Sequence, residues 1–501
     1  MHLSVNIESL LLFGSVLFLV SLFASKAGTR FGVPVLLLFI GVGMVFGTSG
    51  FGFDFENYNM SQAIGTVALC IILFSGGLDT SYKEIKPVAA QGIILATVGV
   101  VLTAFFTGVF IYFVLNFWFP WISVSFLEAM LLASVMSSTD SASVFAILRG
   151  KGVKIKNNLK HMLELESGSN DPMAYMLTVV LIQLITSEQH DELAYGTAVL
   201  SFFMQFVIGI TAGFLLGKAS VWLINKINLD NDSFYPILLI TCGIFVFSAT
   251  DFINGNGFLA VYLAGLVIGN SKFANKRLSL RVFDGLTWIS QIILFLTLGL
   301  LVNPSELWPV AIVSLLIGAF MIFAARPLTV FISLFSFRKT HFRDKIFISW
   351  VGLKGAVPIL FAIFPLTAHL AISSFVFNVV FFITLLSLLI QGTSLTQVAK
   401  LLHLSDENDF IKPKRFTIEF DEEIKSVLEE ITIESDFSCV NKTISEMKLP
   451  KTALIVMIER KDTHFTPNGD TVIEADDRLS VIADSKAKLD LTFQALKVLN
   501  F

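Results

Sequence analysis

Charged residues are scarce in this chain. Asp, Glu, Lys and Arg make up 15% of its 501 residues, whereas soluble globular domains have roughly 25%. Hydrophobic residues account for 54%, and 50 residues are Phe, more than one soluble core could bury. This balance excludes an ordinary soluble globular fold. The net charge of −4 gives no reason to expect a nucleic-acid partner.

Cysteine is also rare, and the usual motifs of enzymes are missing. The three cysteines lie far apart, in two apolar runs and in the polar tail, so no disulfide framework is predicted. We find no metal-ligand cluster, no P-loop and no nucleophile elbow. The sequence therefore predicts neither an enzyme nor a bound cofactor.

Long apolar runs fill residues 1–400, and a transmembrane helix needs about 20 such residues. We predict about thirteen spans, near 9–25, 31–47, 60–78, 88–117, 126–148, 158–186, 194–225, 235–250, 257–270, 279–302, 308–335, 343–365 and 371–398. Lys and Arg gather in every second loop, beginning with Lys26 and Arg30. Because basic loops face the cytoplasm, we expect an outside N-terminus and a cytoplasmic C-terminus in a bacterial inner membrane. No basic residue precedes the first run, so we interpret it as a retained span.

Four polar stretches interrupt these spans, and ionisable residues inside a membrane are usually functional because they are costly there. The stretches are Ser134–Ser143, Glu164–Pro172, Ala325–Pro327 and Gly352–Pro358. Their charged members must pair with one another or face water. Ionisable residues nearer the span ends are interpreted as interfacial, namely Asp79, Glu128 and Lys218.

Residue spacing predicts how the polar groups share helix faces. Glu166 and Asn170 are four residues apart, hence on one face, and we expect Arg326 to bridge both. Ser167 and Asp171 form a second row of oxygen atoms, about 100° around the helix.

Ser, Thr and Gly in the fifth and twelfth spans disfavour continuous helix, so both spans are predicted to unwind. Broken helices expose partial charges of about half an elementary charge at their new ends. Asp140 is placed to neutralise the positive ends and Lys354 the negative ends, which together suit a small cation. These spans are the fifth members of two six-helix halves of inverted topology. We therefore predict an all-α polytopic membrane protein built from two inverted repeats.

The motifs resemble those of a known family. Thr139-Asp140, followed by Glu166-Ser167-Gly168-Ser169-Asn170-Asp171-Pro172, resembles the paired signatures of the monovalent cation:proton antiporter-1 family, and especially its NhaP-type potassium/proton branch. Further marks stand in the same order, at Phe74–Leu78, Leu298–Leu301, Arg326-Pro327, Gly352–Pro358 and Gln391–Thr393. The resemblance covers essentially residues 5–400. It implies an NhaA-like fold with crossed broken helices, a homodimer, and electroneutral exchange of K⁺ or Na⁺ for H⁺.

The resemblance also implies roles for individual residues. Asp171 would bind cation and proton in turn, with further oxygens from Ser167 and the Thr139 backbone. Glu166, Asn170 and Arg326 would form a polar clamp, and Asp140 would stabilise the helix crossing; Lys354 belongs to the same structural set. Two residues depart from the family pattern: Ser75 stands where an acidic residue is usual, and Lys354 where Arg is usual.

The polar tail forms a separate region. Short strands are predicted at Ala453–Glu459 and Arg478–Ala483, with strong turn residues at Pro467–Asp470 between them. Their order resembles the TrkA-C (RCK-C) regulatory domain. We predict a transmembrane domain at 1–400, a linker at 401–414, a small α+β TrkA-C domain at 415–486 and a tail at 487–501. The domain is either a sensor of an unknown, nucleotide-like ligand or a dimerisation module without a ligand.

Three classes of function are open to a polytopic membrane protein of this kind. A cation:proton antiporter, with K⁺ favoured and Na⁺ as the alternative, explains the acids and bases at membrane depth. A cation channel would need a filter motif such as T-V-G-Y-G, which is absent. A membrane-anchored sensor would not need Asp171 or Arg326. The expected partners are lipid, monovalent cations, protons and a second copy of the chain.

Overall fold

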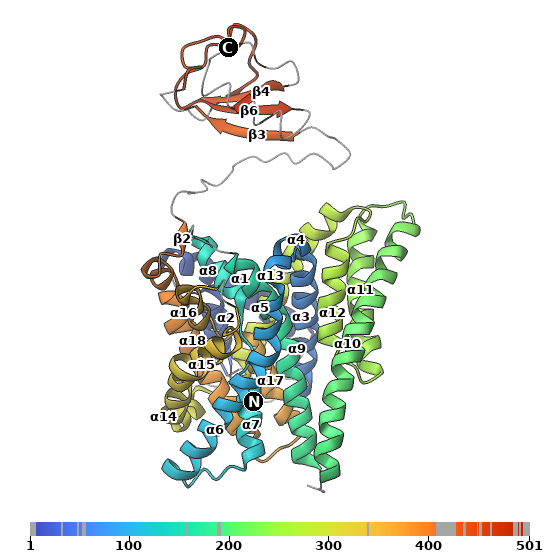
Figure 1. Cartoon of the computed structure of the whole chain (residues 1–501), viewed down its shortest axis with the longest axis vertical. Helices are drawn as coiled ribbons and strands as arrows, with labels where there is room; N and C mark the ends of the chain where they lie inside the picture. Colours follow the sequence, from blue (N-terminus) through green and yellow to red (C-terminus); the bar gives the residue numbers. More distant parts are fainter. Residues whose placement is uncertain are drawn as a thin grey trace. The chain divides into compact units, whose positions relative to one another are not determined.

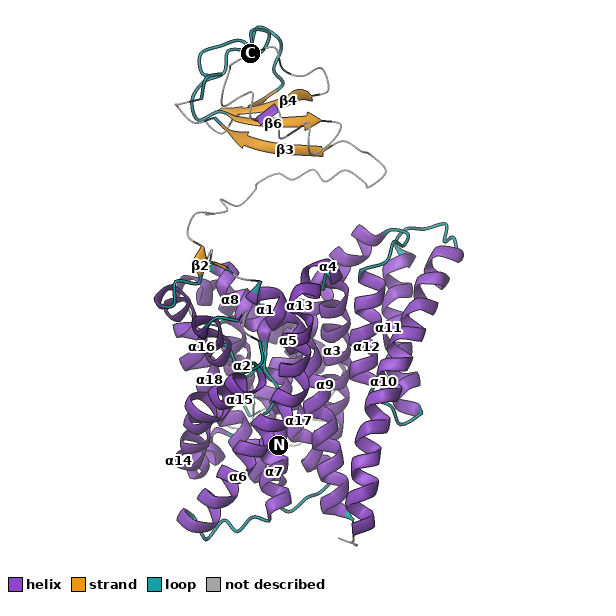
Figure 2. Cartoon of the chain, viewed as in Figure 1, coloured by secondary structure: helices purple, strands orange, loops and turns teal. Residues whose placement is uncertain are grey.

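The computed structural model of the chain describes residues 7–31, 34–47, 50–52, 57–151, 153–156, 158–187, 192–337, 340–406, 427–433, 437–447, 449, 453–460, 463–483, 489 and 492–493. The chain divides into two compact units, Met1–Asp409 and Phe410–Phe501. The first unit is almost entirely helical, and the second contains a small sheet (Figures 1 and 2).

The first half of the helical unit begins with α1 and ends with the long helix α9. Its elements are α1 (Ile7–Phe31), α2 (Val35–Phe46), α3 (Tyr58–Asp79), α4 (Tyr82–Ile85), η1 (Lys86–Val88), α5 (Ala89–Ile94), η2 (Leu95–Gly99), α6 (Val100–Trp118), α7 (Phe126–Val135), α8 (Ser141–Gly150) and α9 (Leu159–Thr186).

The second half follows α10 (Glu192–Lys226). Its elements are α11 (Phe234–Phe252), α12 (Gly257–Gly269), α13 (Lys276–Leu301), α14 (Pro304–Phe320), η3 (Met321–Ala325), α15 (Arg326–Ser333), α16 (Phe342–Trp350), α17 (Ala356–Thr367) and α18 (Ser373–Leu401). A two-stranded antiparallel ladder pairs β1 (Lys154–Ile155) with β2 (Ser405–Asp406).

Several of these helices are long and apolar enough to cross a membrane. Within the described residues, seven helical stretches satisfy both conditions: Tyr58–Asp79, Tyr82–Trp118, Leu193–Lys226, Phe234–Phe252, Lys276–Leu301, Pro304–Ser333 and Ser373–Leu401. Shorter apolar helices include α2, α7, α12 and α17. The first unit is thus a helical membrane domain; the count of thirteen spans stays a prediction.

Two predicted spans are interrupted by non-helical backbone. The helix pair α7 and α8 is separated by Met136–Asp140, and the pair α16 and α17 by Val351–Gly355. Two other spans contain one wide π-helical turn each, at η2 and η3. Such turns are rare in helices and often mark functional regions.

Glycine allows neighbouring helices to approach closely around the site. A Cβ atom on Gly43 of α2 would lie 2.8 Å from the Cα of Gly299 on α13. On α3, a Cβ atom at Gly77 would lie 2.9 Å from the backbone nitrogen of Leu266 on α12. Helix packing inside membranes relies on such small residues, because lipid supplies no hydrophobic force between helices.

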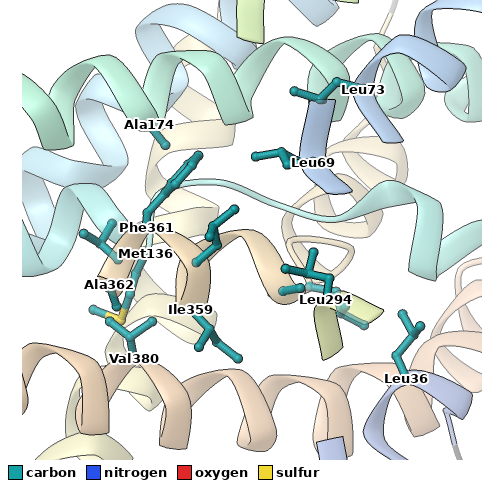
Figure 3. Close-up of a cluster of buried hydrophobic side chains, with 14 of the residues drawn as sticks. Leu36, Leu69, Leu73, Met136, Ala174, Leu294, Ile359, Phe361, Ala362 and Val380 are labelled. Carbon is teal, nitrogen blue, oxygen red and sulfur yellow. The ribbon is translucent and has the colours of Figure 1, made fainter. Parts of the chain in front are cut away.

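Apolar side chains fill the space around the interrupted helices. Figure 3 shows members of this core from several helices: Leu36, Leu69, Leu73, Met136, Ala174, Leu294, Ile359, Phe361, Ala362 and Val380. The core packs directly against the non-helical backbone, since Met136 and Leu353 are both buried within it. Unwound backbone at membrane depth must be enclosed by protein or line a cavity.

The second unit contains a four-stranded antiparallel sheet of order β3-β6-β4-β5. Its strands are β3 (Val427–Thr432), β4 (Ala453–Arg460), β5 (Thr463–Phe465) and β6 (Arg478–Ala483). The two strands predicted from the sequence are β4 and β6. A core of its own, including Ile455, Ile458, Leu479 and Val481, covers the sheet.

Candidate cation and proton site

The two interrupted spans touch one another at their non-helical segments. The backbone N–H of Asp140 donates to the carbonyl of Leu353 (N···O 2.8 Å). The Lys354 ammonium donates to the carbonyl of Ser138 (Nζ···O 2.8 Å). A Cβ atom at Gly355 would collide with the Asp140 carboxylate, so the backbones can meet this closely only with glycine there. The segments between α7 and α8 and between α16 and α17 therefore form one joined structure.

Asp140 and Lys354 each satisfy a helix end left open by the interruption. The Asp140 carboxylate accepts a hydrogen bond from the Ser143 backbone (N···O 3.0 Å) and another from the Ser143 hydroxyl, in the first turn of α8. An acidic group there balances the partial positive charge of the helix start. Lys354 contacts the carbonyl of Ser138 just beyond the end of α7, where the helix dipole is negative.

Polar residues of α18 hold the second interruption in place. The Lys354 backbone N–H donates to the Ser387 hydroxyl (2.9 Å), which in turn donates to Gln391 Oε1 (2.5 Å). The Gln391 amide donates to the carbonyl of Trp350 at the end of α16 (2.8 Å). From the sequence, Gln391 was identified only as part of a motif and Ser387 was missed; their spacing of four residues on one face was the available signal.

Helix α9 binds to the first interruption through the predicted polar rows. The Ser167 hydroxyl donates to the Thr139 carbonyl (2.9 Å) and accepts from the Ser141 backbone (3.1 Å). The Asn170 amide donates to the Thr139 hydroxyl (2.6 Å). Three of the candidate residues thus join α9 to the start of α8.

Glu166 and Arg326 form a buried ion pair between α9 and α15. The Arg326 Nη2 lies 2.5 Å from Glu166 Oε1, and the two side chains are 7% and 1% exposed. The prediction that Arg326 also donates a hydrogen bond to Asn170 is wrong, because the Asn170 side-chain oxygen has no hydrogen-bond partner in the described part of the chain. Asn170 instead donates its amide to the Thr139 hydroxyl, since this face of α9 meets α15 at Glu166 and the first interruption one turn further along, at Asn170.

Asp171 lies beside this assembly with an incompletely satisfied carboxylate. The residue is 7% exposed, and its Oδ1 atom has no hydrogen-bond partner among the described residues. The next residue, Pro172, is held by Asn256 at the start of α12. The Asn256 side-chain amide donates to the carbonyl of Pro172 (2.8 Å), and the Asn256 side-chain oxygen accepts from the Leu259 backbone. Asn256 is another residue that the sequence did not reveal.

A cavity of about 210 Å³ opens onto Asp171 and Asp140. Its apolar wall includes Leu36, Leu69, Leu73 and Leu294, four of the side chains labelled in Figure 3. Its polar lining comes from Asp79, Thr80, Asp140, Ser141, Glu164, Ser167, Asp171, Tyr262 and Gln291. Carboxylate, hydroxyl and amide oxygens are thus exposed to the cavity beside its apolar wall, and hard cations prefer oxygen ligands. No group of three or more His, Cys, Asp or Glu within the described ranges is arranged to hold a metal ion.

Comparison with known proteins gives the family. Residues 14–401 match the family described as sodium/hydrogen exchanger, transmembrane. The chain belongs to the sodium/hydrogen exchanger family. Residues 428–492 match the TrkA-C domain, in agreement with the resemblance of the tail.

Curated relatives support this membership, and a solved structure shows a similar fold. The chain is 35% identical over 483 residues to the K(+)/H(+) antiporter NhaP2 of Shewanella baltica, covering 96% of this chain and 82% of the relative. It is 42% identical over 392 residues to the K(+)/H(+) antiporter NhaP of Alkalimonas amylolytica, covering 78% and 66%. The fold is similar to the sodium proton antiporter MjNhaP1 of Methanocaldococcus jannaschii (TM-score 0.67, 21% identity, 78% of this chain and 99% of that one). The curated relatives are transporters rather than enzymes, and the family membership of this chain is that of a cation/proton antiporter.

Proposed function

We propose that this exchanger moves a monovalent cation, K⁺ in preference to Na⁺, against H⁺ across a bacterial inner membrane. The observation that carries the proposal is Asp171, a buried carboxylate at the wall of the cavity, one oxygen of which has no hydrogen-bond partner among the described residues. Burying a charged carboxylate is costly unless it gains a proton or a cation. A side chain in this position is suited to bind either one.

Competition for one carboxylate explains obligatory exchange. If Asp171 holds either H⁺ or a largely dehydrated cation, and opens to the two sides in turn, each ion crosses only when the other returns. Ser167, which lines the same cavity as Asp171, and Thr139, which Ser167 and Asn170 contact, are expected to supply further oxygens to the cation. Glu166, Arg326, Asp140 and Lys354 hold the surrounding helices through the contacts described above.

Substitution of Asp171 tests this role. In proteoliposomes with an imposed pH gradient, Asp171→Asn should abolish cation-dependent proton flux while the protein still folds, because an amide neither titrates nor carries the charge that binds the cation. The matched control is Asp251→Asn, the same change at an exposed position of α11 outside the cavity lining. Retained exchange in Asp171→Asn would refute the role of this carboxylate.

The preferred cation is proposed from the relatives. Both curated relatives named above are called K(+)/H(+) antiporters, whereas the structural neighbour is called a sodium proton antiporter. Na⁺/H⁺ exchange is therefore the second candidate. Titrating K⁺, Na⁺, Li⁺ and Rb⁺ in the same proteoliposome assay separates them, and we expect half-saturation at the lowest concentration for K⁺.

Exchange should be electroneutral because Asn170, and not a second acid, stands next to Asp171. With one carboxylate, one positive charge moves in each direction. Proton flux should then be unchanged when a gradient of a permeant anion such as thiocyanate, with equal K⁺ on both sides, imposes a voltage on the vesicles. A steep voltage dependence would contradict a single-carboxylate site.

The proposal includes three further points: two inverted repeats, a transport domain at residues 1–400, and a homodimer. The repeats are supported by matching irregularities: the fourth predicted span of each half contains a π-helical turn, and the fifth is broken. The proposed orientation, with the C-terminus in the cytoplasm, rests on the basic loops. Accessibility of a single cysteine introduced at Lys83, in a cysteine-free background, tests the orientation.

We further propose that the TrkA-C unit regulates transport. Its proposed limits are 415–486, after a linker at 401–414 and before a tail at 487–501. The unit is either a sensor of a small ligand or a dimerisation module. Removing residues 410–501 should alter the rate or pH dependence of exchange without abolishing it; loss of all exchange in correctly folded protein would show that the unit belongs to the transport machinery.

A further inference from the structure

The cavity contains a buried tyrosine that the exchange mechanism described above does not use. Tyr262 of α12 is 1% exposed, lines the cavity, and its hydroxyl has no hydrogen-bond partner among the described residues. Leaving a buried hydroxyl without a hydrogen-bond partner is unfavourable. Phe would avoid this cost, so the phenol oxygen is suited to a ligand that enters the cavity.

Close packing places the Tyr262 hydroxyl beside the face of α9 that lines the cavity. A Cβ atom at Gly168 would lie 2.9 Å from the Tyr262 hydroxyl oxygen and would collide with the ring. Gly168 is three residues before Asp171 and four after Glu164, so all three share one face of the helix. At 1.5 Å per residue, Tyr262 is level with a point about 4.5 Å from Asp171 and about 6 Å from Glu164 along the axis.

Other oxygen atoms surround the phenol. The side chains of Thr80 and Ser169 lie next to its hydroxyl, although neither forms a hydrogen bond of good geometry with it. Thr80 and Glu164 line the same cavity. The Glu164 side chain is 32% exposed, whereas Tyr262 and Asp171 are both buried, so Glu164 is the solvent-accessible residue of the three.

We propose that Tyr262, Thr80 and Glu164 form a second binding site for the transported monovalent cation, here called the vestibule site. The inference rests on the proposed cation/proton exchange. At this site the cation replaces part of its hydration shell by phenol and hydroxyl oxygens, while the Glu164 carboxylate balances its charge. Dehydration then takes place in two steps, which favours passage because each site binds weakly enough to release the ion.

The test is Tyr262→Phe in the full-length protein, assayed in proteoliposomes with K⁺ as the probe. The ring is retained and no hydrogen bond among the described residues is lost, so we expect unchanged thermal stability. The K⁺ concentration at half-maximal exchange should rise about tenfold, because losing one oxygen ligand of the ion should cost at least as much as losing a hydrogen bond to a charged group, about 1.5 kcal/mol. The maximal rate should change by less than about twofold, because Asp171 is intact.

Two further variants make the result interpretable. Thr80→Val, which keeps the shape of the side chain, should raise the half-maximal K⁺ concentration less, about threefold, because the Thr80 hydroxyl already donates to the Gly76 carbonyl (2.6 Å) and so is less free to orient toward the ion. Tyr235→Phe is the matched control: this buried tyrosine lies outside the cavity lining, and its hydroxyl accepts a hydrogen bond from the Leu229 backbone. Tyr235→Phe should leave K⁺ dependence unchanged.

The outcomes separate the vestibule site from the proposed function. If Asp171→Asn is inactive and Tyr262→Phe keeps the wild-type K⁺ dependence, the vestibule site is wrong and the exchange mechanism stands. If Tyr262→Phe instead unfolds or loses several degrees of thermal stability, the hydroxyl has a structural role and the proposal is overturned. If Asp171→Asn retains exchange, the proposed role of Asp171 fails, whatever the result at Tyr262.

Discussion

The ion pair between Glu166 and Arg326 should be the most stability-sensitive polar contact of the transport domain. The pair is buried, with side-chain exposures of 7% for Arg326 and 1% for Glu166. Glu166→Gln removes one charge and leaves the guanidinium buried without its counter-ion. Such losses typically cost about 3–5 kcal/mol. We expect the lower end, about 3 kcal/mol, because Glu166 Oε2 and Arg326 Nε already lack hydrogen-bond partners within the described chain.

Thermal unfolding in detergent measures this cost. With an unfolding entropy of about 2.1 cal/mol/K per residue over a domain of this size, about 3 kcal/mol corresponds to a fall in Tm of about 4 °C. The matched control is Glu164→Gln, the same change two positions earlier on α9. There the carboxylate is 32% exposed and lies 3.6 Å from Lys160, and exposed pairs contribute about 1 kcal/mol or less.

A second substitution distinguishes a broken pair from general damage. Arg326→Met in the Glu166→Gln background removes the stranded charge, so the double variant should recover part of the lost stability; coupling energies of contacting residues are about 0.5–3 kcal/mol. The single variant Arg326→Met completes the comparison. The reasoning from burial is refuted if Glu166→Gln unfolds within about 1 °C of the wild type, or if the stability lost in the double variant equals the sum of the losses in the two single variants.

Three further predictions concern other contacts. Gly168→Ala should reduce exchange strongly, because the added methyl group would displace the Tyr262 ring from the cavity wall; wild-type exchange would show that the ring has room to move. Asn256→Ala should cost about 2–4 kcal/mol, from a lost helix cap and an unsatisfied buried carbonyl, and Asn256→Asp, which keeps the cap, should recover part of the Tm. In the TrkA-C unit, hydrogen bonds from Thr443 lower the pKa of Glu446 below its usual 4.5. A lowered pKa contributes stability above about pH 4.5 that is lost on acidification. In Glu446→Gln the free energy of unfolding of the unit, measured by chemical denaturation, should therefore fall less steeply as the pH drops below this value.

The sequence predicted the parts of the site that depend on local spacing. Ser167 and Asp171, and Glu166 and Asn170, are four residues apart, and a helix necessarily places such pairs on common faces. The interruptions at Met136–Asp140 and Val351–Gly355 also followed from local composition, because Ser, Thr and Gly runs are poor helix formers. The charge of Arg326 at membrane depth required a partner, and Glu166 was the acid predicted for it.

Partners that meet across the bundle were decided only by the tertiary structure. Spacing on α9 could not tell that Asn170 faces Thr139 rather than Arg326, since that choice depends on how α9 is rotated against α8 and α15. Tyr262 lies in an apolar run, where an aromatic residue is usually part of the core, and only the absence of a side chain at Gly168 brings its hydroxyl into the cavity. The sequence alone determines which groups are too costly to leave unpaired in lipid; the packing of the helices decides which groups satisfy them.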